Sequence, residues 1–241
     1  MRALATTIRV LQQIQHDHRT VALLLFVPSV LIGLMAWLFD ETEVFDRIGP
    51  AVLGLFPFII MFVVTSITTL RERRSGTLER LLTMPLSKLD FILGYALAFG
   101  LLAIVQALIA CGSAIWIFGL EIEGSVWLLL AVALADGLLG TTLGLLASAF
   151  ARTEFQVVQF MPAFVFPQVI LGGVFIPRDQ MPDVLHATSD WLPLSHAIDA
   201  LDAVARDSED AAWVASKLLI IGAFALGAVV LGAITLRRRT P

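Results

Sequence analysis

Residues 51–91 read AVLGLFPFIIMFVVTSITTLRERRSGTLERLLTMPLSKLDF, an uncharged apolar run followed by a segment that carries five of the chain's 16 Lys and Arg residues. The apolar run begins at residue 48 and ends at residue 70, which is enough to cross a bilayer as an α-helix. Comparable runs cover residues 20–39, 91–120, 125–151, 155–177 and 218–236. The sequence therefore predicts an all-α integral membrane protein with six transmembrane helices in one domain over residues 1–241.

The composition supports this class. The chain is 58% hydrophobic and 15% charged, whereas a soluble domain is about half apolar and about a quarter charged. Its net charge of −4 reflects the loops between the apolar runs and does not indicate a nucleic-acid surface.

The distribution of cations predicts the orientation. Short loops rich in Lys and Arg stay in the cytoplasm, so we expect the 68–91 loop and both termini to lie there. This arrangement places twelve cations inside and four outside, the latter being Arg47, Arg178, Arg206 and Lys217. The protein is thus expected to be a multi-pass protein of the cell membrane.

Two short amphipathic segments flank the first spans. Residues 1–19 place Leu4, Ile8 and Leu11 on one face, which predicts an interfacial helix. Residues 75–85 place Leu78, Leu81 and Leu82 on one face before Pro85 discourages further helix. Such a short helix needs a docking surface, either lipid headgroups or a partner protein.

Two motifs give the chain a family resemblance. RERRSGTLERLLTMPLSKLDFILGYALA begins at residue 71, and GGVFIPRDQMPDVL with the later LPLSHAIDA begins at residue 172. Together they resemble the membrane subunit of type-2 ATP-binding-cassette exporters, the permease family of bacterial drug, lipid and polysaccharide efflux. The resemblance implies a coupling helix that binds a separate ATPase through Gly76, Thr77, Leu78, Glu79, Arg80, Leu81 and Leu82.

The ATPase is expected on a partner chain. The chain's two lysines, Lys88 and Lys217, do not lie in a phosphate-binding P-loop, so ATP and Mg²⁺ are assigned to the partner and no cofactor to this chain. The sequence has no metal-binding or nucleophile motif, and we expect no enzymatic activity. The turn with Arg152 and Glu154 is either a second contact with the ATPase or a solvated turn.

Asp136 is the charged residue within an apolar run, and glycines follow it at 137, 140 and 144. It either bonds a neighbouring helix or lines a pathway and relays protons. The resemblance also implies that the second and fifth spans line the route between two permease subunits. The pathway candidates there are Phe56, Phe58, Phe62, Phe164 and Phe166, with ordinary packing as the alternative.

The predicted function is therefore a permease subunit of an ATP-driven exporter. It would pair with an identical or related permease, contact membrane lipids, and export an amphiphile such as a drug, a lipid or a lipid-linked glycan. Residues 178–214 are expected to form short helices outside the membrane. The alternatives are an ion-coupled secondary transporter that uses Asp136 and a membrane scaffold that transports nothing.

Overall fold

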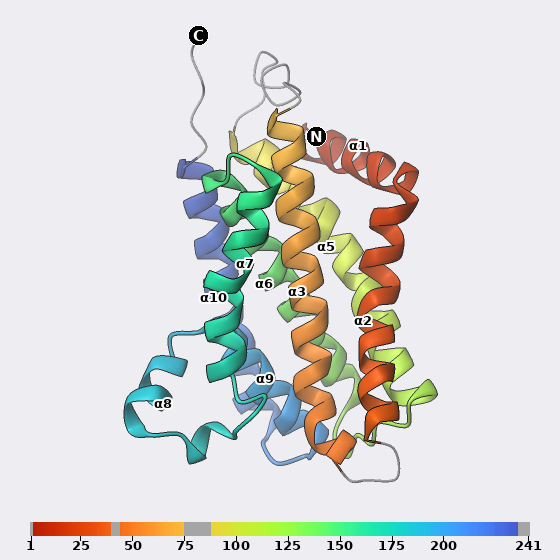
Figure 1. The fold of residues 1–241 in the computed structure, drawn as a ribbon, viewed down its shortest axis with the longest axis vertical. Coiled ribbons are helices and arrows are strands. Elements are labelled where there is room, and N and C mark those ends of the chain that lie inside the picture. Colours follow the sequence, from red (N-terminus) through yellow and green to blue (C-terminus); the bar gives the residue numbers. More distant parts are fainter. Residues whose placement is uncertain (1, 40–43, 75–87, 236–241) are drawn as a thin grey trace.

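Six long helices form the body of the protein (Figure 1). The computed structural model describes residues 2–39, 44–74 and 88–235, and within these ranges the regular structure is helical, without strands. The six helices are long and apolar enough to cross a membrane, so the predicted fold class is confirmed. They are α2 (His18–Leu38), α3 (Val44–Arg74), α5 (Lys88–Gly112), α6 (Val126–Phe150), α7 (Glu154–Leu171) and α10 (Ala211–Thr235).

The helix α1 (Arg2–His16) lies across one end of this bundle (Figure 1). Its buried side chains, Val10 and Ile14, pack on the core, and Thr7 donates a hydrogen bond to the carbonyl of Gly94 in α5 at 3.1 Å. Leu4 and Ile8 are exposed, as an interfacial helix requires. The chain then turns at a break in the helix, where the carboxylate of a capping aspartate starts α2.

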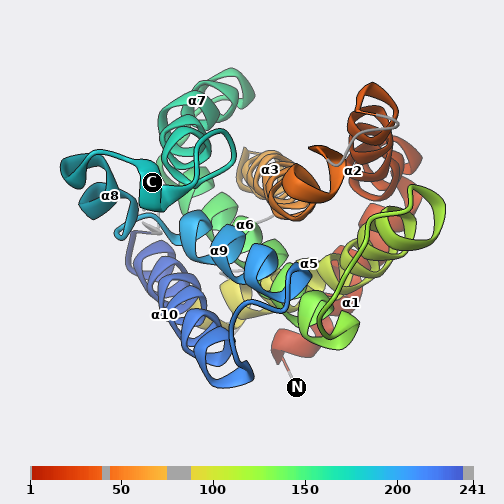
Figure 2. The same ribbon diagram turned by 90° about the horizontal axis from the view of Figure 1, so that it is seen from below.

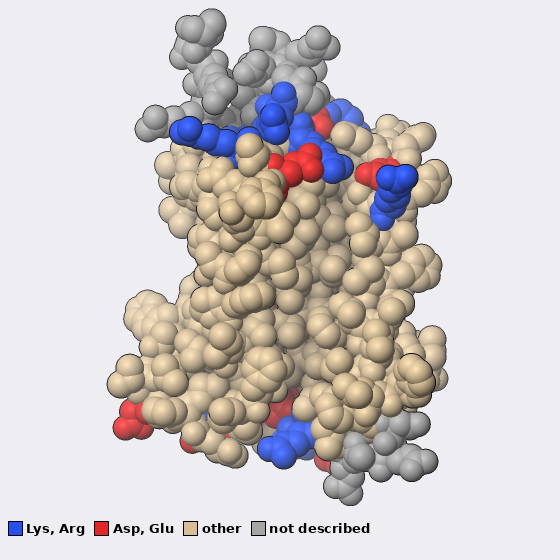
Figure 3. All heavy atoms as spheres, viewed as in Figure 1, with Lys and Arg blue, Asp and Glu red and all other residues tan. Residues whose placement is uncertain are grey.

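The two ends of the bundle differ in charge (Figure 3). The end that holds α1 is called here the arginine-rich end. The helices and turns at this end carry Arg9, Arg19, Arg71, Arg73, Arg74 and Arg152. The opposite end, called the acidic end, carries the segment between α7 and α10. A wide band without charged atoms separates the two ends on the face shown, which is the pattern of a membrane-embedded belt.

The helices α3 and α6 form the core of the bundle and pack closely along their length. An added Cβ at Gly140 or Gly144 would lie 2.6 Å from the carbonyl oxygen of Phe58 or Phe62, respectively. The glycines on α6 therefore allow the two backbones to approach, as small residues do in membrane helices. The helices α2 and α7 flank α3 and bury few of their residues.

Short elements close the acidic end. The helix α7 ends at Leu171, before the apolar run that begins at residue 155 is complete. Gly173 follows with a positive φ of 91°. A 3₁₀ turn η2 (Arg178–Gln180), α8 (Asp183–Ser189) and α9 (Pro193–Ala205) come next. Figure 2 shows α9 lying across the end of the bundle, where it contacts α3, α6 and α10. The predicted short helices in residues 178–214 are thus present.

The tryptophans also distinguish the two ends. Four of the five tryptophan side chains are strongly exposed, and all five lie near the acidic end. They lie in the last turn of α2, in the π-helical turn η1 (Ser113–Ile117) that follows α5, at the start of α6, in the segment before α9 and at the start of α10. Tryptophan prefers the headgroup level of a bilayer. The acidic end therefore carries an aromatic belt.

Candidate functional site

The last turn of α3 carries a buried carboxylate within an arginine cluster. Glu72 is 4% exposed and forms an ion pair with Arg9 of α1. Gln13, one turn further along α1, donates a second hydrogen bond to Glu72 at 3.2 Å. Arg9 also donates to the hydroxyl of Tyr95 on α5 at 3.2 Å. Three elements therefore meet at one acidic side chain, and charge-assisted bonds of this kind are among the stronger ones.

The neighbouring arginines attach the same turn to two more helices. Arg71 forms a two-point ion pair with Glu154 of α7, at 2.8 and 3.1 Å. Arg73 donates a hydrogen bond to the carbonyl of Ser148 near the end of α6. The final turn of α3, which directly precedes residues 75–87, is thus bonded to α1, α6 and α7.

Of the residues predicted to contact the ATPase, some lie within the described ranges and others lie outside them. Gly76, Thr77, Leu78, Glu79, Arg80, Leu81 and Leu82 lie outside the described residues. Glu154 takes part in the ion pair with Arg71, and Arg152 is exposed beside it, with its backbone amide donating to Gln156 at 2.9 Å. The turn between α6 and α7 therefore lies beside the last described turn of α3.

The aromatic pathway candidates separate into two groups. Phe58 and Phe62 are buried in the core, and Phe56 is partly buried against it. Phe164 and Phe166 on α7 are about half exposed, at 54% and 52%. The structure therefore does not bring the five phenylalanines together in a single cavity of the described chain.

Asp136 lies in the interior of the bundle. It is fully buried, and neither carboxylate oxygen has a hydrogen-bond partner among the described residues. Its Oδ2 lies 3.7 Å from the position that a Cβ at Gly54 would occupy, so the missing side chain of this glycine provides room for the carboxyl group. The predicted bond to a neighbouring helix is not present in the described part of the chain.

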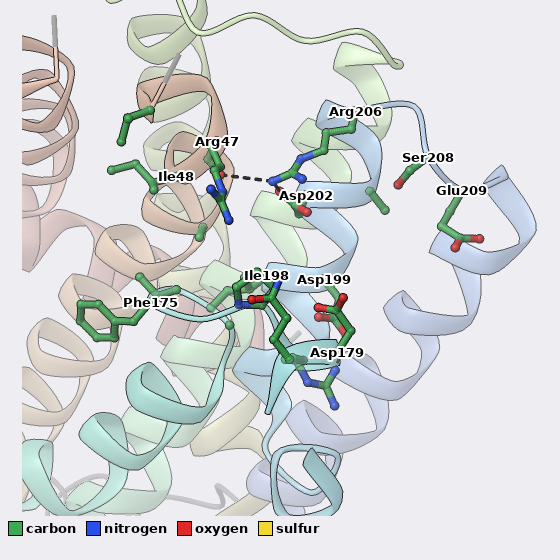
Figure 4. Close-up of a pocket in the computed structure, with 18 of the residues that line it drawn as sticks. Arg47, Ile48, Phe175, Asp179, Ile198, Asp199, Asp202, Arg206, Ser208 and Glu209 are labelled. Carbon is green, nitrogen blue, oxygen red and sulfur yellow. Dashed lines mark hydrogen bonds and ion pairs between the residues drawn. The ribbon is translucent and has the colours of Figure 1, made fainter. Parts of the chain in front are cut away.

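A pocket of about 700 Å³ opens at the acidic end (Figure 4). It lies between the start of α3, the segment after α7, α9 and the start of α10. Its wall carries both signs of charge, with Arg47 on α3 facing Asp199 and Asp202 on α9. The exposed residues Ser208 and Glu209 form its rim, while Ala51 and Ile198 line its apolar part.

A buried arginine holds the short elements around this pocket. Arg178 pairs with Asp190 and Asp199, and its Nε donates to the hydroxyl of Ser189 at 2.8 Å. Lys217 at the start of α10 also pairs with Asp199, at 3.0 Å. The network therefore ties η2 to α8, α9 and α10.

His196 extends the same network in its neutral form. Its Nε2 lies 2.9 Å from the carbonyl oxygen of Asp190, and its Nδ1 lies 3.4 Å from Lys217 Nζ. These contacts fit a ring that donates from Nε2 and accepts at Nδ1. Burial lowers the pKa of His196, which also favours the neutral ring.

Comparison with known proteins supports the resemblance. A family model described as ABC-2 type transporter matches residues 3–205. The chain is 30% identical over 150 residues to the probable multidrug ABC transporter permease YbhR of Escherichia coli strain K12, an alignment that covers 62% of this chain and 41% of YbhR.

Two further relatives align with a similar share of this chain. ABC transporter G family member 20 of Dictyostelium discoideum is 27% identical over 161 residues, which cover 67% of this chain and 22% of that protein. The linearmycin resistance permease protein LnrN of Bacillus subtilis strain 168 is 29% identical over 149 residues, which cover 60% of this chain and 38% of LnrN. The chain thus spans less than half the length of these curated relatives.

Proposed function

This chain belongs to the ABC-2 type transporter family, and we propose that it acts as the membrane-spanning permease subunit of an ATP-driven exporter. Its six long apolar helices supply the membrane domain. The names of relatives include a multidrug permease and a resistance permease, which supports an amphiphilic cargo such as a drug, a lipid or a lipid-linked glycan.

The attachment of the final turn of α3 carries this proposal. Glu72, Arg71 and Arg73 bond that turn to α1, α7 and α6 immediately before residues 75–87. A partner that displaces residues 75–87 therefore pulls on several helices together, because packed helices move as rigid bodies. This is the mechanical link that a permease without its own motor needs.

The motor in this proposal is an ATP-binding-cassette ATPase on a partner chain, with ATP and Mg²⁺ bound there. The 241 residues contain no P-loop of their own. The arginine-rich end faces the cytoplasm, where the ATPase contacts Gly76–Leu82 and the turn with Arg152 and Glu154. A second permease, identical or related, completes the route across the membrane.

The test uses the full chain reconstituted in liposomes with the ATPase that co-purifies with it. Leu81→Asp places a charge on the predicted docking face, so we expect ATP-dependent flux of an NBD-labelled phospholipid to fall at least tenfold while membrane insertion is retained. Thr83→Asp is the matched control, because residue 83 lies on the opposite side of the predicted helix.

Three outcomes contradict the proposal. Normal ATP-driven flux by Leu81→Asp removes the docking role of this face. Flux of the isolated chain under a proton gradient, without the ATPase, supports a secondary transporter. A stable complex with the ATPase that moves neither the NBD-labelled phospholipid nor an ethidium probe supports a scaffold.

A further inference from the structure

Asp136 is a carboxyl group without a partner in the middle of α6. It is fully buried, and neither of its oxygens is hydrogen-bonded within the described chain. An isolated carboxylate in an apolar interior costs so much free energy that such groups take up a proton instead. Residues of this kind inside a membrane domain are expensive and commonly functional.

The neighbours of Asp136 connect it to the acidic-end pocket. The Cβ position at Gly54 lies 3.7 Å from Asp136 Oδ2, 2.8 Å from Leu201 Cδ1 and 3.8 Å from Ile198 Cγ1. Ile198 also lines the pocket, together with Ala51, which lies one turn before Gly54 on α3. The side chains of α9 therefore separate the carboxyl group from the pocket, and a movement of α9 away from α3 would hydrate it.

Pro57 leaves one carbonyl of α3 without its helical donor in the turn next to Gly54. Residue 57 is proline and has no amide hydrogen, so the carbonyl of Leu53 lacks its usual helical donor four residues on. Leu53 is fully buried next to Gly54. A protonated carboxyl group can donate a hydrogen bond, whereas a carboxylate can only accept one.

We propose that Asp136 is a proton-binding site that exchanges its proton with the acidic-end pocket when α9 and α3 separate. The O–H bond of the buried carboxyl breaks, the proton passes to water in the pocket, and the hydrated carboxylate remains. When α9 returns to α3, the carboxylate takes the proton back. One proton per chain is thus released on separation.

The pH dependence follows by reciprocity. Since separation releases a proton, a rise in pH at the acidic end favours the separated arrangement, and a fall favours the packed one. Other titratable and charged groups lie on the elements that pack against α6. Among residues whose side chains the structure describes, α3 carries Asp46 and Arg47 at its start and Arg71, Glu72, Arg73 and Arg74 at its other end. The remaining groups are Tyr95 and Cys111 on α5, Glu154 at the start of α7, His196, Asp199 and Asp202 on α9, and Lys217 on α10.

Asp202 is the competing candidate within the pocket. Burial raises its pKa, and it pairs with Arg206 at 2.7 Å. It differs from Asp136 because it has this partner and because its side chain is 37% exposed. Substitution of each acid by its amide therefore shows which of the two carboxyl groups is the proton-binding site.

The test measures the distance between spin labels at Val44→Cys and Ser208→Cys, on opposite sides of the pocket, in a Cys111→Ala background. The purified full chain in lipid nanodiscs is examined from mildly acidic to alkaline pH. We expect the distance distribution to shift to longer values as the pH rises, with or without Asp202→Asn. With Asp136→Asn, which cannot release the proton, we expect no shift.

A persistent shift in Asp136→Asn, or no shift in the parent protein, overturns the proposal. Asp136→Leu serves as a second variant, because an apolar residue of similar size suits this buried position if the amide prevents folding. Infrared spectroscopy gives an independent readout. The parent protein must show the band of a protonated carboxyl in an apolar site, and this band must be missing in both Asp136 variants. Neither measurement requires the ATPase, so both are independent of the proposed function.

Discussion

Glu72 is the residue on which the arginine-rich end depends. It is an acidic residue between arginines in the sequence, and its side chain is only 4% exposed. It accepts hydrogen bonds from two side chains of α1. Removal of one partner from a buried, charge-assisted pair leaves the other without compensation. The free energy cost is reduced here because Arg9 is 32% exposed and can be hydrated.

We expect Glu72→Gln to destabilise the protein by about 1–3 kcal/mol and to lower the cargo exported per ATP hydrolysed. The reason is that α1 loses its ionic attachment to the turn that adjoins the coupling segment. Thermal unfolding in detergent and a paired flux and ATPase assay measure the two effects. For the unfolding measurement alone, Glu154→Gln is the matched control, since its ion pair with Arg71 is exposed and contributes less than about 1 kcal/mol. Equal effects of the two substitutions would argue against a special role for Glu72.

Sequence reasoning reached some of these residues and missed others. Asp136 could be predicted because a charge inside an apolar run is conspicuous. The pairing of Glu72 with Arg9 could not, because the two residues are 63 positions apart and only the packing of α1 on α3 joins them. The signal that could have indicated it is an acid placed within a run of arginines. The sequence likewise indicates only a loop cation at Arg178, whereas the structure buries this side chain and pairs it with two aspartates.

At the scale of elements, the contact between α3 and α6 defines the bundle. The glycines of α6 lie against backbone carbonyls of α3, so the two helices are closer than side chains would allow. Glycine in a helix interior is itself unfavourable by about 1 kcal/mol relative to alanine. Close packing must therefore compensate for this cost.

Gly140→Ala tests this contact. Its methyl group would lie 2.6 Å from the carbonyl oxygen of Phe58, which is backbone and cannot rotate away. We expect a loss of about 1–3 kcal/mol, measured as a lower midpoint of thermal unfolding. Gly227→Ala on α10 is the control, because nothing lies within 4 Å of an added Cβ there and helix propensity improves. A stabilising effect of Gly140→Ala would show that α3 and α6 can separate without cost.

The elements themselves were predicted well where hydrophobicity alone decides. Each apolar run became a helix, because lipid leaves the backbone no other way to satisfy its hydrogen bonds. Hydropathy predicts that the fifth span extends through residue 177, whereas α7 ends at Leu171. Two consecutive glycines and a positive φ at Gly173 end it, which hydropathy does not register. The position of α9 across the bundle end also could not be predicted, because it depends on contacts with the distant helices α3, α6, α7 and α10.

At the scale of the whole molecule, the charge asymmetry predicts which end faces the cytoplasm. We expect Ser208→Cys at the acidic end to react with a membrane-impermeant maleimide on intact cells, in a Cys111→Ala background. Arg152→Cys at the arginine-rich end should react only after permeabilisation, because arginine-rich loops are retained inside. Both positions are exposed, so burial does not confound the comparison. The reverse labelling pattern would invert the proposed direction of transport.

The one-sided placement of the tryptophans has a consequence for how the protein meets bilayers of different thickness. Indole rings at the acidic end fix the depth of that end in the headgroup layer. None of the five tryptophans lies at the opposite end, where long arginine side chains can snorkel to the headgroups. We therefore expect hydrophobic mismatch to be accommodated mainly at that end. We therefore expect the lipid composition of the membrane to act first on α1 and the helix ends that it joins, which are the parts that the proposed motor would also move.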